Sequence, residues 1–92
     1  MAFNKNDKYK FNTTWNEVPA VYGIFNSSMQ IIYIGQTDNL KRRMAEHQND
    51  TYHCMHRYSP AFVKAEVIRD EATRFSRERQ LILEFQPTCN QR

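Results

Sequence analysis

Arg43 and His47 are the first residues whose placement in the sequence raises the question of chemistry. With Leu40 and Met44 they fall at i, i+3, i+4 and i+7, which is one arc of an α-helix. Leu40 and Met44 must face the core, so Arg43 and His47 border the packed face. An arginine in such a place commonly extends past its apolar neighbours to solvent, and a lone histidine is commonly structural. Their spacing alone therefore leaves a structural and a functional role open for both.

Glu78 raises the same question later in the chain. By 3.6-residue geometry it lies on one arc with Phe75, Ile82 and Phe85. A carboxylate on an apolar stripe needs a partner, because burying an unpaired charge is costly. One partner is a divalent metal, since Mg²⁺ is often held by one or two carboxylates with water and phosphate. The other is an arginine in a salt bridge, for which the candidates are Arg43, Arg74 and Arg79.

The elements that must position these residues begin with a hairpin. Val21–Phe25 and Ile31–Ile34 are β-branched and aromatic, which predicts two strands joined by a polar turn. A helix should follow directly, with Asp38 or Thr37 as its N-cap and its end near Gln48.

A third strand and a second helix are expected in the other half of the chain. Residues 61–68 predict the strand, although the pattern does not show which face is buried. Asp70 and Glu71 begin the helix with acids in its first turn. The helix should end at Glu84 or Phe85, because Pro87 prevents its continuation.

The glycines of the hairpin lie within two short motifs. Gly23 and Gly35 are the only glycines in the chain, and glycine in a strand is costly unless backbone or ligand must come close. Gly23-Ile24-Phe25 and Tyr33-Ile34-Gly35 resemble the paired signature of the GIY-YIG nuclease family. The resemblance covers most of the chain, because an arginine, a histidine, a glutamate and an asparagine follow in the family's order: Arg43, His47, Glu78 and Asn90.

This resemblance implies an α+β fold with a three-stranded antiparallel sheet flanked by helices, in a single domain of residues 1–92. It also implies a divalent-metal-dependent endonuclease that hydrolyses a DNA phosphodiester. Tyr33 would be the general base, which requires nearby positive charge because a free phenol has a pKa of about 10. Arg43 would contact the scissile phosphate, and Glu78 would hold Mg²⁺ or Mn²⁺.

Two further residues take supporting roles in that resemblance. His47 would add positive charge, relay the proton onward, or orient water itself. Asn90 would fix the C-terminal segment or touch phosphate. Candidate DNA-binding residues, which give affinity without sequence information, are Gln36, Lys41, Arg42 and Arg57.

Two residues depart from the family's pattern. Phe25 stands where the family usually has a tyrosine, so the hydroxyl of that position is lost. Tyr22 is not expected to replace it, because it lies on the opposite face of the strand. Gln36 stands where some relatives carry a lysine. These departures motivate the alternative of a catalytically weak or inactive nucleic-acid-binding module, and a small interaction domain with incidental charge is a third possibility.

Composition sets the remaining expectations. Ninety-two residues with a net charge of +3 make one mildly basic domain, which favours DNA as a polyanionic partner. With no separate DNA-binding part expected, specificity would come from a protein partner, a homodimer or DNA structure, and repair, restriction, mobile-element and phage roles all fit. No apolar run is long enough to span a membrane, and no signal region opens the chain, so a cytoplasmic location is expected.

Two segments carry weaker expectations. Residues 1–14 are polar and basic, and their start should be loose. Cys54 and Cys89 should be reduced thiols in the cytosol, since two cysteines are too few for a disulfide scaffold. Zinc near His53 and His56 is disfavoured, because the spacings match no usual zinc pattern.

Overall fold

A computed structural model describes residue 3 and residues 7–90. Its strands are β1 (Tyr9–Lys10), β2 (Ala20–Phe25), β3 (Ile31–Thr37) and β4 (Phe62–Val67). Its helices are α1 (Leu40–Asn49) and α2 (Glu71–Phe85), with the short 3₁₀ helices η1 (Cys54–Tyr58) and η2 (Thr88–Asn90). The predicted α+β class is confirmed, but the antiparallel sheet has four strands and not three.

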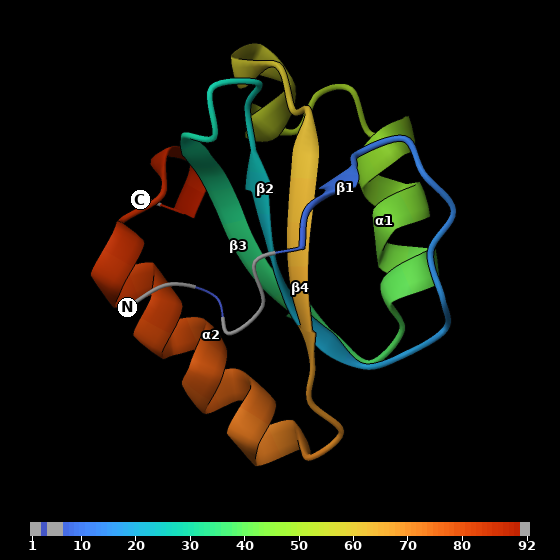
Figure 1. Cartoon of the computed structure of the whole chain (residues 1–92), viewed down its shortest axis with the longest axis vertical. Helices are drawn as coiled ribbons and strands as arrows, with labels where there is room; N and C mark the ends of the chain where they lie inside the picture. The colour runs from blue at the N-terminus through green and yellow to red at the C-terminus, as the bar shows by residue number, and fades with distance from the viewer. Residues whose placement is uncertain (1–2, 4–6, 91–92) are drawn as a thin grey trace.

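The sheet has the strand order β1-β4-β2-β3, so that β3 is an edge strand. Figure 1 shows α1 on one side of this sheet and α2 on the other. The second 3₁₀ helix, η2, returns to pack beside β3. A side chain from either helix can therefore approach the outer edge of β3, which is where the predicted functional residues must meet.

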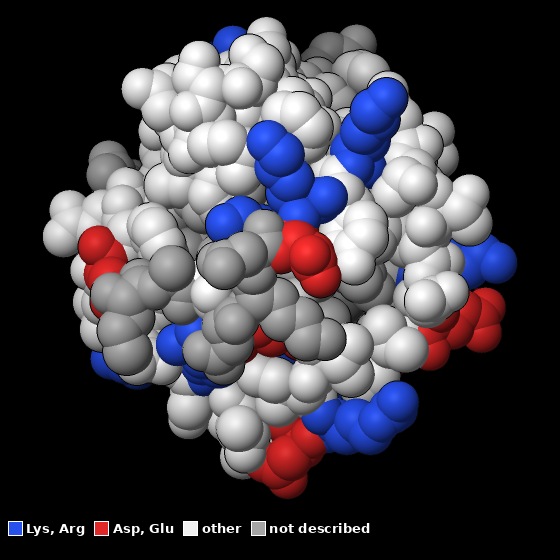
Figure 2. Space-filling model, viewed as in Figure 1, with Lys and Arg blue, Asp and Glu red and all other residues white. Residues whose placement is uncertain are grey.

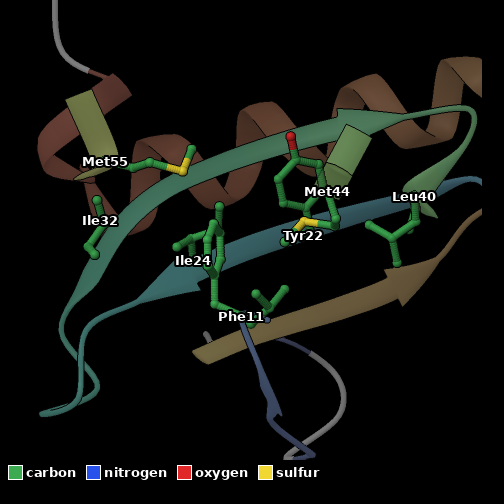
Figure 3. Packing of buried hydrophobic residues seen from close by; sticks show 9 residues of the cluster. Phe11, Tyr22, Ile24, Ile32, Leu40, Met44 and Met55 are labelled. Atoms are coloured by element: carbon green, nitrogen blue, oxygen red, sulfur yellow. The ribbon is translucent and has the colours of Figure 1, made fainter. Parts of the chain in front are cut away.

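Each face of the sheet buries its own apolar cluster. On the α1 side, nine buried residues pack together, and Figure 3 shows Tyr22 and Ile24 of β2 among Leu40 and Met44 of α1 and Met55 of η1. On the α2 side the cluster is smaller: Phe3, Val21, Phe25, Ile34 and Leu81. Alternate residues of β2 thus serve opposite cores, because neighbouring side chains of a strand point to opposite faces.

The two glycines of the hairpin each make room for an aromatic side chain. A Cβ at Gly35 would lie 2.5 Å from the hydroxyl oxygen of Tyr22 and 3.0 Å from the ring of Tyr33. A Cβ at Gly23 would lie 2.6 Å from the ring of Phe3. Since these distances are too short for any real side chain, close approach of neighbouring groups explains both glycines.

The N-terminal segment is more ordered than its composition predicts. Tyr9 and Lys10 form β1 and pair with Val63 and Phe62 of β4. Phe11 is buried in the cluster on the α1 side, and Phe3 is buried on the α2 side. Residue 3 and the segment from residue 7 onward therefore belong to the folded domain, and the expectation of a loose start falls largely on residues 1–2 and 4–6, which lie outside the described part of the chain.

The helix boundaries agree closely with the sequence pattern. The N-cap of α1 is Asn39, one residue after the predicted Asp38, and its side chain accepts a hydrogen bond from the backbone N–H of Arg42. Asp70 caps α2, which ends at Phe85 as predicted. Within the described residues, neither helix is long and apolar enough to cross a membrane.

Cys54 and Cys89 are joined by a disulfide, with their Cα atoms 5.7 Å apart. The prediction of reduced thiols is therefore wrong. The bond ties the start of η1 to η2, two segments separated by 35 residues. Sequence spacing could not reveal this pairing, because it depends on η2 returning across the end of β3.

Candidate active site

Arg43 lies between the two tyrosines of the hairpin. Its guanidinium donates a hydrogen bond to Glu46 at 3.0 Å and interacts with the hydroxyls of Tyr22 and Tyr33. Burial disfavours the charged guanidinium, but these interactions outweigh it and raise the pKa of Arg43 above its usual value. The charge that the resemblance requires beside Tyr33 is therefore present, on a side chain that remains partly exposed.

Tyr22, and not Phe25, brings the first tyrosine hydroxyl of the hairpin to this cluster. Its oxygen lies 2.7 Å from Nε2 of His47, and its ring is tilted against Tyr33 with centroids 6.3 Å apart. Phe25 points to the other face and packs edge-on against Phe3. The expectation that the hydroxyl is lost, and that Tyr22 cannot supply it, is therefore wrong.

Burial sets the protonation of this pair. Desolvation, with the neighbouring Tyr33, raises the pKa of Tyr22 far above that of a free phenol. Desolvation, with the positive charge of Arg43, lowers the pKa of His47 to about 4. At neutral pH the phenol is therefore protonated and the imidazole uncharged, so Tyr22 can donate its proton to Nε2 of His47. His47 is 2% exposed, and its lowered pKa disfavours the expected role as a source of positive charge.

Glu78 approaches the outer edge of β3 from α2. Burial raises the pKa of this carboxyl, while a hydrogen bond from the backbone N–H of Gln36 partly opposes the rise. Among the described residues it forms no ion pair with Arg43, Arg74 or Arg79. The structural alternative of a salt bridge is thus not observed, and the carboxylate stays available as a ligand.

The apolar arc proposed around Glu78 is only partly buried. Ile82 and Phe85 pack against the cluster on the α2 side. Phe75 is 49% exposed and lines a hollow beside Glu78. The carboxylate therefore borders the core rather than lying inside it, which lets it reach the surface.

Asn90 holds the same edge of β3 from the C-terminal side. Its Oδ1 accepts a hydrogen bond from the backbone N–H of Ile34 at 2.7 Å, and its Nδ2 donates to the carbonyl of Ile34 at 2.9 Å. Of the two roles considered for Asn90, the structure thus shows the fixing of the C-terminal segment. Because Ile34 follows Tyr33 directly, Asn90 also fixes the backbone beside that phenol.

Two residues of this cluster escape the sequence analysis. One is Tyr22, whose signal is the register of the hairpin, since it pairs directly with Gly35 and needs the space that glycine leaves. The other is His53, whose ring lies edge-on to Tyr33 with centroids 5.1 Å apart and 5.4 Å from that of His47. It comes from a stretch without a periodic pattern, so no sequence signal identified it.

The candidate DNA-binding residues are spread around the site. Lys41 and Arg42 are exposed on α1, where Arg42 forms an ion pair with Asp38 at 2.6 Å, and Arg57 is exposed on η1. Gln36 stands on β3 and accepts a hydrogen bond from Arg74. Figure 2 shows basic and acidic side chains interspersed over one face of the molecule.

The oxygen donors at the site fit a hard divalent cation. The described residues contain no cluster of three or more histidine, cysteine, aspartate or glutamate side chains that could hold a metal by themselves. Mg²⁺ needs no such cluster, because it keeps several waters and is commonly bound through one or two carboxylates and substrate phosphate. Glu78 is the carboxylate that could serve.

Several solved structures with the same fold come from one enzyme. The GIY-YIG N-terminal endonuclease domain of UvrC from Thermotoga maritima superimposes with a TM-score of 0.72 at 28% identity, over 84% of this chain and 87% of that domain. That structure is a tyrosine-to-phenylalanine point mutant bound to its catalytic divalent cation. The magnesium-bound domain gives the same TM-score at 27% identity, over 83% of this chain and 86% of that one.

An asparagine-to-alanine mutant of the domain, also bound to its catalytic divalent cation, has a TM-score of 0.71 at 25% identity, over 84% and 87% of the two chains. No curated protein sequence matches the chain. The family model described as the GIY-YIG catalytic domain matches residues 18–91, which include the hairpin, both helices and η2. The chain therefore belongs to the GIY-YIG family.

Proposed function

We propose that this chain is a divalent-metal-dependent endonuclease that hydrolyses a DNA phosphodiester. The observation that carries the proposal is the position of Arg43, whose guanidinium contacts the hydroxyls of Tyr22 and Tyr33 and remains partly exposed. Glu78 of α2 lies against the backbone of Gln36, which follows Tyr33 by three residues on β3. A phosphate that meets Arg43 would therefore have a phenol and a carboxylate within the same part of the surface.

Tyr33 is the general base in this proposal. It is half-buried and can reach substrate, whereas Tyr22 is fully buried and stays protonated because its pKa is raised. As a phenolate, Tyr33 would take a proton from the attacking water and become a neutral phenol. The guanidinium of Arg43 would stabilise the phenolate beforehand and the negative charge that develops on the phosphate afterwards.

Tyr22 and His47 act behind Tyr33 as positioning residues. Arg43 interacts with the oxygen of Tyr22, whose hydroxyl proton is directed to Nε2 of His47. The uncharged imidazole accepts this hydrogen bond, so the buried pair helps to hold the guanidinium beside Tyr33. The tyrosine of the first signature is then Tyr22, so that Ala20-Val21-Tyr22 takes the place first given to Gly23-Ile24-Phe25. This removes the main reason for an inactive module.

Glu78 would hold Mg²⁺ or Mn²⁺, with water and a phosphate oxygen as its other ligands. When bound, such a cation supplies charge stabilisation at the phosphate and at the leaving oxygen. The backbone N–H of Gln36 fixes one side of the carboxylate, and Asn90 fixes the strand two residues earlier through Ile34. These contacts keep the carboxylate of Glu78 in place before the cation and the substrate bind.

The remaining parts of the proposal concern partners. Lys41, Arg42, Arg57 and Gln36 would contact the DNA backbone, which gives affinity without sequence information. Specificity would come from DNA structure, from a protein partner or from a homodimer. The proposed site of action is the cytoplasm, although the disulfide of this chain is of a kind more usual in oxidising compartments.

A nicking assay on supercoiled plasmid tests the proposal. The chain should nick in Mg²⁺ or Mn²⁺, Glu78→Ala should abolish nicking, and Tyr33→Phe should slow it by about 100-fold or more. Matched controls are Glu17→Ala, at an exposed residue, and Tyr9→Phe, at a half-exposed tyrosine of β1 on the opposite edge of the sheet, and both should leave the rate unchanged. DNA binding without nicking, equal in the wild type and in both site variants, would instead identify a binding module.

A further inference from the structure

Arg74 of α2 is a buried arginine that the mechanism above does not use. It is 4% exposed. Its Nε donates a hydrogen bond to the side-chain oxygen of Gln36 at 2.9 Å. Its Nη1 lies 3.4 Å from the carbonyl oxygen of Ile68 and 3.5 Å from that of Arg69. These partners are all neutral, and the two contacts to carbonyls are long.

The guanidinium of Arg74 thus has no carboxylate within ion-pair distance among the described residues. The nearest acids are engaged elsewhere, since Asp70 caps α2 through Thr73 and Asp38 pairs with Arg42. Both carboxylates still attract Arg74 at longer range, since its charge contributes to lowering their pKa values. A buried charge without a direct ion pair is nevertheless costly, and an apolar side chain of similar length would serve packing better. The arrangement is therefore expected to serve an anion that comes from outside the chain.

A polar hollow of about 550 Å³ opens at this arginine, between the end of β3, the start of α1 and the start of α2. Arg43 and Arg74 both line it. Two of its three acids are neutralised within the hollow, by the pairs Arg42–Asp38 and Arg43–Glu46. The third, Glu71, is exposed. The volume of the hollow is within the range of pockets that hold small ligands.

We infer that this hollow is a second phosphate-binding site, in which Arg74 contacts a phosphodiester of the DNA strand beside the phosphate held by Arg43. The inference rests on the proposed function, because that function supplies the strand. Gln36 has two tasks in this arrangement: its side chain orients the guanidinium of Arg74 and its backbone N–H binds Glu78. The arginine fork suits phosphate oxygens, and a partner from outside compensates its buried charge.

Binding of a duplex oligonucleotide in EDTA, measured at several salt concentrations, tests this site without requiring cleavage. Arg74→Met should weaken binding about tenfold and lower the slope of log K against log salt by about one. The melting temperature of Arg74→Met should be unchanged or higher, since an uncompensated buried charge is removed. Lys10→Gln, a charge loss at the opposite edge of the sheet, should change the affinity much less.

Two further variants keep the test decisive if Arg74→Met does not fold. Arg74→Lys retains the charge and should keep the salt slope while losing affinity, because it lacks the planar fork. Glu71→Gln removes the exposed acid and should tighten binding about two- to fivefold. Inorganic phosphate should raise the melting temperature of the wild type and leave that of Arg74→Met unchanged.

An unchanged affinity and salt slope in Arg74→Met would overturn the inference, as would Glu71→Gln that binds DNA no better. A phosphate effect on melting without any effect of Arg74→Met on DNA binding would show a site for the free ion and also overturn it. Failure of the wild type to nick plasmid would count against the proposed function alone, because the binding assay contains no divalent metal.

Discussion

The phenol oxygen of Tyr22 lies 2.7 Å from Nε2 of His47, and this contact joins β2 to α1 inside the molecule. Both side chains are buried, so neither meets substrate directly. Arg43 connects them to the surface, since it bonds the hydroxyls of both Tyr22 and Tyr33. The buried pair therefore helps to fix the guanidinium that lies beside the phenol of Tyr33.

Removal of the buried hydroxyl of Tyr22 tests whether it positions Arg43. Tyr22→Phe should slow nicking by about ten- to a hundredfold, because Arg43 and His47 both lose a partner. It should also lower the free energy of unfolding by about 1–3 kcal/mol, since Nε2 of His47 is left buried without a hydrogen bond. Nicking rates and chemical denaturation measure the two effects.

The matched control is Phe25→Tyr, which adds a hydroxyl to the same strand on the other face. It should not restore nicking to Tyr22→Phe, because Phe25 packs with Phe3 away from the site. Rescue by the double change Tyr22→Phe with Phe25→Tyr would show that the first signature lies at residues 23–25 after all.

His47 predicts a dependence of stability on pH. Its pKa is lowered to about 4 in the folded chain from 6.5, because burial and then Arg43 disfavour the imidazolium. The unfolded chain therefore takes up a proton first as the pH falls. The contribution of His47 to the free energy of unfolding should be constant above about pH 6.5. It should fall by at most about 3 kcal/mol as the pH is lowered from 6.5 to 4.

Urea denaturation at a series of pH values measures the slope of the free energy of unfolding against pH. His47→Gln should flatten it, while an amide oxygen can still accept from Tyr22. Residual slope from His53 is expected, because burial lowers its pKa as well. A slope between pH 6.5 and 4 that is identical in His47→Gln would contradict the assignment of a neutral, buried imidazole.

The two hairpin glycines allow a paired test of site against core. Gly35→Ala places a methyl group against the hydroxyl of Tyr22 and the ring of Tyr33, so it should reduce nicking strongly. Gly23→Ala meets the ring of Phe3 on the other face. Each should cost about 1–3 kcal/mol of stability through overpacking, but Gly23→Ala should retain nicking in its folded fraction. If Gly35→Ala and Gly23→Ala had equal stability and lost nicking activity equally, the assignment of Gly35 to the site and of Gly23 to the core would be wrong.

The disulfide predicts a link between redox state and the hold of Asn90. Loss of the bond in Cys54→Ala with Cys89→Ala should lower the free energy of unfolding by about 3–4 kcal/mol, given the 35-residue separation. Since Cys89 precedes Asn90, the amide of Ile34 should exchange with solvent faster. Hydrogen exchange measures this, and Asn90→Ala with the disulfide intact should show the same loss at Ile34. Unchanged exchange at Ile34 in the double variant would separate the disulfide from the site.

Much of the fold follows from local pattern. Three strands were predictable from β-branched and aromatic composition, and both helices from helical periodicity with a nearby cap, as at Asp70. The fourth strand was not, because β1 has only two residues and depends on pairing with β4. The burial of Phe3 likewise depends on the space left by Gly23, which no local pattern reveals.

The site was predictable where function depends on spacing along one element. Arg43 and His47 lie on one helical arc, which placed both at the border of the packed face, whereas the expectation of Arg43 near Tyr33 came from the family resemblance. The error over Phe25 arose because one motif can be read in two registers. Only the pairing of Tyr22 with Gly35 shows which tyrosine faces the site.

The hold of Asn90 on Ile34 also bears on how copies of this chain can associate. An exposed edge strand can recruit a strand from another molecule and start aggregation. Here the amide of Asn90 occupies both backbone groups of Ile34 that such a strand would use, and Glu78 occupies the N–H of Gln36. The residues that build the site thus also cap the sheet, so any dimer must form without extending β3.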